Sequence, residues 1–229
     1  MKLFRNIGLL LFCQCIFIQS LHAEEKKSFD VFPRAGIGLN KLAYVQSDGT
    51  QLDANYVTLN LGLTVNYGKF YVDMLGELFG SDFLENEGEI TGIEREDYTF
   101  TAGYMLIPAV SIFVGYTDGE MKDDFQGEFH EDKGPFVGAS YSYLHNVTSY
   151  AAHLAYADLD GSVTVDEAPE DNTLGETSGF SYGFSISGPF RETMGYAIAL
   201  KVRQYDYEVD GTNEVTDKRI TSLSLGLIF

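Results

Sequence analysis

Apolar side chains alternate with small or polar ones along most of this chain, and this period of two constrains the fold more than any other feature. The clearest segment runs from Val57 to Tyr67, where Val, Leu and Tyr occupy every second position and Thr, Asn and Gly lie between them. Such alternation is typical of a β-strand with two different faces. Ten segments show it: 29–44, 57–67, 70–74, 98–104, 110–116, 137–143, 150–156, 180–186, 194–202 and 222–229. The sequence therefore predicts an all-β fold.

The smaller face of these strands decides which kind of β-protein to expect. Ser, Gly, Thr, Ala and Asn lie between the rows of Leu, Val, Tyr and Phe. These residues could not fill the dry core of a soluble lipocalin-like barrel, and a soluble sandwich does not predict an aromatic residue at the end of the last strand. A membrane barrel instead turns its apolar face to lipid and its polar face to the lumen. We therefore predict a transmembrane antiparallel up-and-down β-barrel of ten strands, with eight as the alternative count.

The connections between the predicted strands alternate in length. Four are tight turns, at residues 67–70, 106–109, 144–146 and 188–191. The other five are expected to be loops of about 10 to 20 residues, as on the outer side of outer-membrane barrels. These loops are centred near Gly49, Gly88, Gln126, Val165 and Gly211. Tyr and Phe lie beside both sets of connections, which predicts an aromatic belt at each membrane interface.

Residues 1–23 have the pattern of a cleaved secretory signal peptide. Lys2 and Arg5 precede an apolar run, and Leu21-His22-Ala23 is a plausible cleavage site. The only two cysteines, Cys13 and Cys15, lie within it and lack the small preceding residue that lipid attachment requires. We therefore expect one domain, residues 24–229, without disulfides.

The charge of the chain excludes one class of partner. Its 34 acidic residues outnumber 15 basic ones, so clustered cations for nucleic acid are not expected. Most of the acids lie in the five predicted long loops, which would make the outer surface anionic. Solubility alone is one explanation. The alternative is that the loops hold divalent cations among surface lipopolysaccharide, or repel anionic ligands.

One predicted loop partly matches an EF-hand calcium loop. Asp158, Asp160, Gly161, Val163 and Glu167 occupy positions 3, 5, 6, 8 and 12 of that motif. The first position is Tyr156, where the motif needs Asp. We therefore predict no metal site from it.

Five charged residues fall on the small-residue face of the predicted strands, and we take them as the candidate site. They are Arg34, Asp73, Glu77, Lys201 and Arg203. Because buried charges must be paired, we expect an ion-pair cluster across the lumen. It would either hold a narrow barrel together, which we favour, or form a constriction for small solutes.

The histidines give little support for catalysis. His153 alone is expected to face the lumen, and its strand offers no nucleophile or carboxylate beside it. The strand number resembles that of the omptin surface proteases, but their Asp pair and Asp-His pair find no convincing match. Neither does the His-x-Ser pair of the lipid A deacylase barrels. No catalytic residue and no cofactor is predicted.

As a whole, residues 24–229 resemble the superfamily of small outer-membrane β-barrel proteins, of the OmpX, OmpW and opacity-protein kind. The resemblance rests on the signal peptide, the lipid-facing alternation and Leu223, Leu225, Leu227 and Phe229, which look like the strand that the barrel assembly machinery reads. It implies a monomer in the outer membrane of a Gram-negative cell, surrounded by lipid and lipopolysaccharide. We expect a non-enzymatic role in surface interaction or envelope integrity. The alternatives are a narrow porin-like diffusion channel and, less favoured, an omptin-type surface hydrolase.

Overall fold

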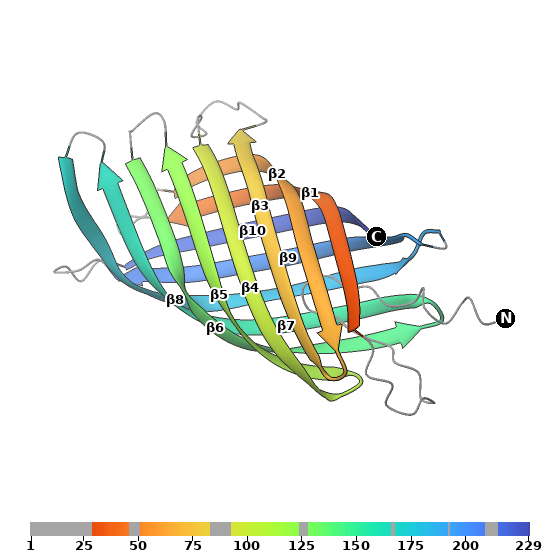
Figure 1. Cartoon of the computed structure of the whole chain (residues 1–229). Coiled ribbons are helices and arrows are strands. Elements are labelled where there is room, and N and C mark those ends of the chain that lie inside the picture. The colour runs from red at the N-terminus through yellow and green to blue at the C-terminus, as the bar shows by residue number, and fades with distance from the viewer. Residues whose placement is uncertain are drawn as a thin grey trace.

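The computed structural model describes residues 29–45, 51–82, 93–123, 128–165, 168–191, 193–208 and 215–229. They form ten β-strands that curve round a single barrel (Figure 1). The strands are β1 (Phe29–Val45), β2 (Gln51–Tyr67), β3 (Phe70–Asp82), β4 (Ile93–Ile107), β5 (Val110–Asp123), β6 (Glu128–His145), β7 (Thr148–Val165), β8 (Ala168–Pro189), β9 (Gly195–Glu208) and β10 (Val215–Ile228). No helix long and apolar enough to cross a membrane occurs in these ranges.

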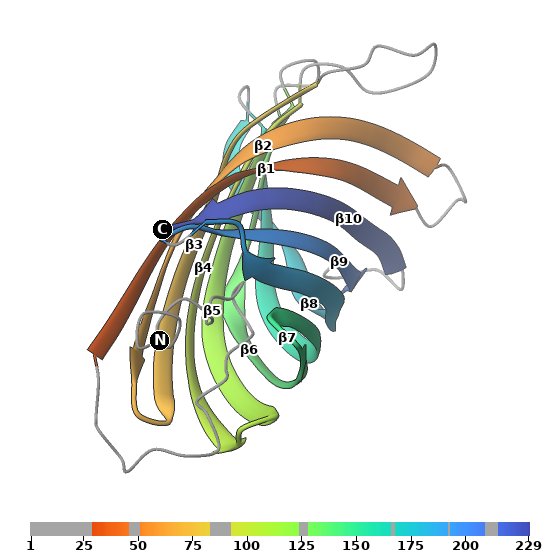
Figure 2. The ribbon, with the colours of Figure 1, turned by 90° about the vertical axis from the view of Figure 1, so that its right-hand side faces the viewer.

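Each strand pairs with its neighbours in sequence, and β1 closes the barrel by pairing with β10. All pairs are antiparallel, so the predicted ten-stranded up-and-down barrel is confirmed. The strands are long and strongly tilted (Figure 2). The β2–β3 turn contains Gly68 at φ 60°, a conformation that glycine adopts readily. The β6–β7 turn contains Asn146 at φ 55°, a residue that also tolerates this region.

The two faces of the barrel have the predicted chemistry. Outward side chains remain exposed although they are large and apolar, for example Val114 at 58% and Leu154 at 55%. Inward side chains are small or polar and buried, for example Thr64 at 3% and Ser187 at 2%. A protein in water would not leave so many apolar side chains exposed. The outer face is therefore suited to lipid.

The strands extend further than the alternation predicts, and the long connections are shorter. β7 runs to Val165 and β8 begins at Ala168. The prediction of a long loop centred near Val165 is therefore wrong. Asp158 and Asp160 lie in β7, where they face Ser178 and Glu176 of β8 in a regular ladder. They therefore lie in a strand and not in a loop. Glu167 and the predicted signal peptide lie outside the described residues.

Candidate functional site: a polar network in the lumen

Arg34 and Asp73 of the candidate site form a buried ion pair near the short-turn end of the barrel. Arg34 Nη2 lies 2.7 Å from Asp73 Oδ1, and the Thr64 hydroxyl donates a hydrogen bond of 2.6 Å to the same oxygen. Gly62 makes room for the arginine, since a Cβ there would lie 2.3 Å from Arg34 Nε. The predicted cluster across the lumen included Arg34 and Asp73, whereas in the structure this pair joins the neighbouring strands β1, β2 and β3.

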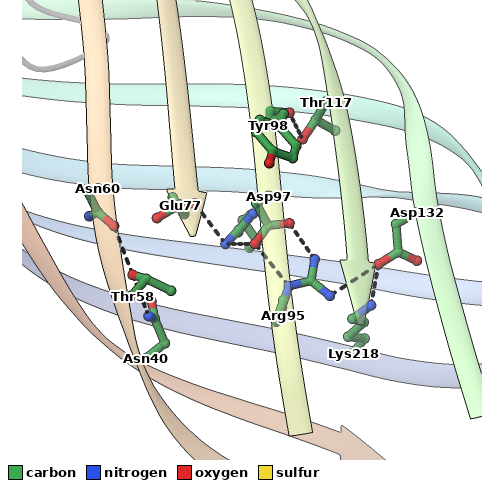
Figure 3. A network of polar contacts seen from close by, with 11 residues as sticks. Asn40, Thr58, Asn60, Glu77, Arg95, Asp97, Tyr98, Thr117, Asp132 and Lys218 are labelled. Atoms are coloured by element: carbon green, nitrogen blue, oxygen red, sulfur yellow. Dashed lines mark hydrogen bonds and ion pairs between the residues drawn. The ribbon is translucent and has the colours of Figure 1, made fainter. Parts of the chain in front are cut away.

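Glu77 and Arg203 belong to a larger group nearer the opposite end. Arg203 Nη2 donates to Asp97 Oδ2 at 3.1 Å and lies 3.3 Å from Glu77 Oε2. Asp97 also receives two hydrogen bonds from Arg95, from Nη2 at 2.6 Å and from Nε at 2.9 Å (Figure 3). Asp97 therefore binds two guanidinium groups at once.

Two further residues extend this group across the lumen. Arg95 Nη1 lies 3.6 Å from Asp132 Oδ2, and Lys218 donates a hydrogen bond to the same oxygen (Figure 3). We call the six residues Glu77, Arg95, Asp97, Asp132, Arg203 and Lys218 the lumenal network. It contains three carboxylates and three cations, each no more than 5% exposed. Pairing and hydrogen bonding of this kind are what make buried charges tolerable.

The contacts of the lumenal network join walls that lie opposite one another. Asp97 is on β4 and Arg203 on β9, and these strands are five steps apart in either direction round the closed barrel. Asp132 on β6 and Lys218 on β10 are four steps apart. The side chains therefore meet across the lumen at this height.

Sequence reasoning missed four members of this network: Arg95, Asp97, Asp132 and Lys218. They lie in strand extensions beyond the apolar alternation, in segments that we expected to be loops. Lys201, which we did predict, faces a cavity of about 30 Å³ that Arg203, Thr99, Thr117 and Ser181 also line. A cavity of this size holds one or two water molecules.

Apolar side chains close the lumen further toward the short-turn end. Tyr71, Phe113, Ala151 and Ala155 form a buried cluster with Met105 and Phe136 packed against it. Tyr71 lies over Gly103 of the next strand, where a Cβ would be only 2.1 Å from its ring. Its hydroxyl lies 3.3 Å from Ser111 Oγ, which in turn lies 2.7 Å from Ser140 Oγ. The lumen is thus filled by side chains at two heights.

His153 lies in the lumen, as expected, with its ring packed over Gly183. Its Nε2 atom is buried and has no hydrogen-bond partner among the described residues. None of the described residues therefore orients the His153 ring through a hydrogen bond to this atom.

An acidic cluster lies on the outer wall of the barrel instead of in a loop. Oxygen atoms of Asp118, Glu120 and Glu131 lie within 4.8 Å of one another, on β5 and β6. Lys133 Nζ donates to Glu131 Oε1 at 2.8 Å, and this hydrogen bond raises the pKa of Lys133. We call the three carboxylates the acidic wall cluster. Acidic residues by themselves do not define a metal site.

Comparison with solved structures defines the class of protein. The outer membrane protease OmpT from Escherichia coli matches with a TM-score of 0.54 and 11% sequence identity, over 90% of this chain and 99% of that one. Neisserial surface protein A matches with a TM-score of 0.44 and 11% identity, over 88% and 98%. No family model and no curated protein matches the sequence. The chain therefore has the fold of outer-membrane β-barrel proteins, and at this identity the likeness shows the fold alone.

Proposed function

We propose that this protein is a closed, non-enzymatic barrel that acts at the cell surface, in surface interaction or in maintaining the envelope. The observation that carries the proposal is the Arg203–Asp97 contact between opposite walls, together with the other pairs of the lumenal network. A barrel of eight strands is just wide enough to be filled by side chains, so ten strands with long charged residues inside leave little free lumen. A filled lumen leaves the outer surface as the part that meets other molecules.

Catalysis and diffusion are less well supported. The OmpT match gives no residue roles to this chain, and His153 has no carboxylate in hydrogen-bonding contact among the described residues. The cavity beside Lys201 is small, with about 30 Å³ of space for water-sized molecules. Diffusion through the lumen would require the ion pairs of the lumenal network to separate.

A deletion strain of the bacterium that carries this gene tests the proposal. The assay compares uptake of small hydrophilic solutes with surface attachment and with sensitivity to detergents and large antibiotics. We expect unchanged uptake and a change in attachment or sensitivity, restored by the wild-type gene and equally by His153→Ala. A loss of solute uptake would favour the channel. A failure of His153→Ala to restore the phenotype would favour an enzyme.

A further inference from the structure

Two cations lie on the lipid-facing side of the β1–β10 seam, immediately beyond its last apolar residues. Lys41 and Arg219 are both exposed and point outward, whereas their neighbours Leu42 and Lys218 point inward and are buried. Toward the membrane, Leu39 and Leu223 are 51% and 42% exposed, as lipid-facing side chains should be. We call Lys41 and Arg219 the basic seam. On β1 and β10 the cations come before any acid, and Asp53 of the neighbouring strand β2 lies in the same ladder row as Arg219.

The depth of the basic seam matches the edge of the hydrocarbon layer. Arg219 lies ten residues before Phe229, the aromatic residue at the other end of the same strand. With a rise of about 3.3 Å per residue and a tilt of about 40°, this gives a height of roughly 25 Å. The apolar band of outer-membrane barrels is about 25 Å tall. The basic seam therefore lies where the phosphate groups of outer-leaflet lipid begin.

The ladder register places further donors beside the two cations. Lys41 is directly opposite Asn55 on β2 and Thr221 on β10, and Arg219 is opposite Ala43, one diagonal step away. Opposite residues have Cβ atoms about 5 Å apart and diagonal ones about 7–8 Å. Long side chains bridge such distances, so one phosphate can contact an ammonium and a guanidinium together.

The acids nearest to the basic seam are Asp53, Asp206 and Asp217. Asp206 and Asp217 lie on the side of Arg219 that faces away from the membrane, so they do not stand between the cations and the lipid. Lys41 Nζ lies 2.8 Å from Asp53 Oδ2, but the two side chains are 54% and 27% exposed, and exposed pairs of this kind are weak. The acidic wall cluster is on β5 and β6, and β6 is five steps from β1 round the barrel. A lipid phosphate would be repelled there unless a divalent cation came between.

We propose that the basic seam binds a phosphate group of outer-leaflet lipid A directly, without a bridging metal ion. The site is formed by Lys41 and Arg219, with Thr221 and Asn55 as additional hydrogen-bond donors. It fixes which face of the barrel holds a lipid molecule. The proposal depends on the outer-membrane location and not on the role proposed above, so either can fail alone.

The test measures binding of diphosphoryl lipid A and of the same lipid without phosphates to the refolded protein in detergent, by native mass spectrometry in EDTA. We expect the wild type to prefer the phosphorylated lipid. The double variant Lys41→Gln/Arg219→Gln should lose at least about tenfold of that preference. Lys122→Gln/Lys133→Gln on the opposite wall, which removes the same charge, should keep it. Lys41→Arg/Arg219→Lys should restore most of it.

Three results would overturn the proposal. The first is a wild type with no preference for the phosphorylated lipid. The second is a preference that survives in the Lys41→Gln/Arg219→Gln variant. The third is a preference that requires added Mg²⁺ and disappears when Glu120 and Glu131 are replaced by Gln, because the contact would then be a metal bridge at the acidic wall cluster. Heat-modifiable migration of every variant shows that each is folded.

Discussion

Asp97 is the residue on which the lumenal network depends most, because its two oxygens bind Arg95 and Arg203 at the same time. Asp97→Asn keeps the shape of the side chain but leaves two buried guanidinium groups without their shared anion. Removing one partner of a buried pair usually costs about 3–5 kcal/mol. We expect the free energy of unfolding to fall by about that amount, measured by urea titration of the refolded barrel in detergent.

The matched control is Glu96→Gln on the same strand. Glu96 is the neighbour of Asp97 and faces outward, where it accepts a hydrogen bond from Tyr98. Exposed contacts of this kind contribute less than about 1 kcal/mol. Equal effects of the two variants would contradict the special role that we assign to Asp97.

Asp206 lies on β9 beyond the membrane-spanning part of the strand, and its ionisation makes the stability of the barrel depend on pH. It faces Asp217 on β10, and burial, followed by the charge and hydrogen bond of Asp217, raises its pKa. A raised pKa means that the folded state holds the proton more tightly than the unfolded state. Ionisation of Asp206 is therefore destabilising above this pKa, and the cost disappears as the pH falls through it toward the ordinary value.

The variant Asp206→Asn should consequently be more stable than the wild type at pH 7. The difference should shrink as the pH is lowered toward 4, since the wild-type carboxyl is then protonated. Paired urea titrations at several pH values measure it. A difference that stays constant or grows in acid would show that the Asp206–Asp217 pair is not the cause.

At the level of elements, the packing of β3 against β4 depends on Gly103, because the ring of Tyr71 occupies the space that a side chain at this position would need. Gly103→Ala would place a methyl group against the ring of Tyr71, which is buried and close to Ser111 Oγ. Overpacking of this kind costs about 1–3 kcal/mol. Gly76→Ala is the control, because a Cβ there meets Tyr98 only at 3.6 Å. We expect a lower unfolding midpoint for the first variant and an unchanged or higher one for the second.

β10 carries a separate prediction about assembly. Phe229 is exposed, and its backbone N–H donates to Pro33 O at 3.0 Å, so the last residue also helps to close the barrel. Phe229→Ser keeps this backbone contact. If Leu223, Leu225, Leu227 and Phe229 are read by the assembly machinery, the variant should accumulate poorly in the outer membrane of cells but refold normally in detergent. Phe190→Ser, at an exposed turn, should accumulate and refold normally. Equal loss of Phe229→Ser in both assays would indicate a simple folding defect.

The elements also show where sequence reasoning reaches its limit. Within the lipid, one face must be apolar, so the alternation in 57–67 marks β2 and its orientation correctly. Beyond the lipid, both faces are polar, so the sequence no longer alternates between apolar and polar residues and does not mark the strand. Arg95 and Asp97 therefore read as loop residues although they point inward from β4. Arg34 and Asp73 could be assigned to the inner face because both lie among lipid-facing neighbours, but their pairing with each other was not predicted.

At the scale of the whole molecule, two separate groups of side chains occupy the described part of the lumen, at different heights. Apolar packing around Tyr71 closes it near the short turns, and ion pairs between opposite walls close it further up. The closed state that we propose therefore rests on two groups of contacts with different physical bases. The outer wall, in contrast, offers an acidic cluster on one side and a basic seam on the other.

The most direct test of the closed barrel is the conductance of single refolded molecules in a planar bilayer, with a porin as positive control. We predict a silent membrane for wild-type protein that shows heat-modifiable barrel migration. Stable openings whose size changes in Lys201→Gln/Arg203→Gln would contradict the account, because they would show that the lumen lined by these residues conducts.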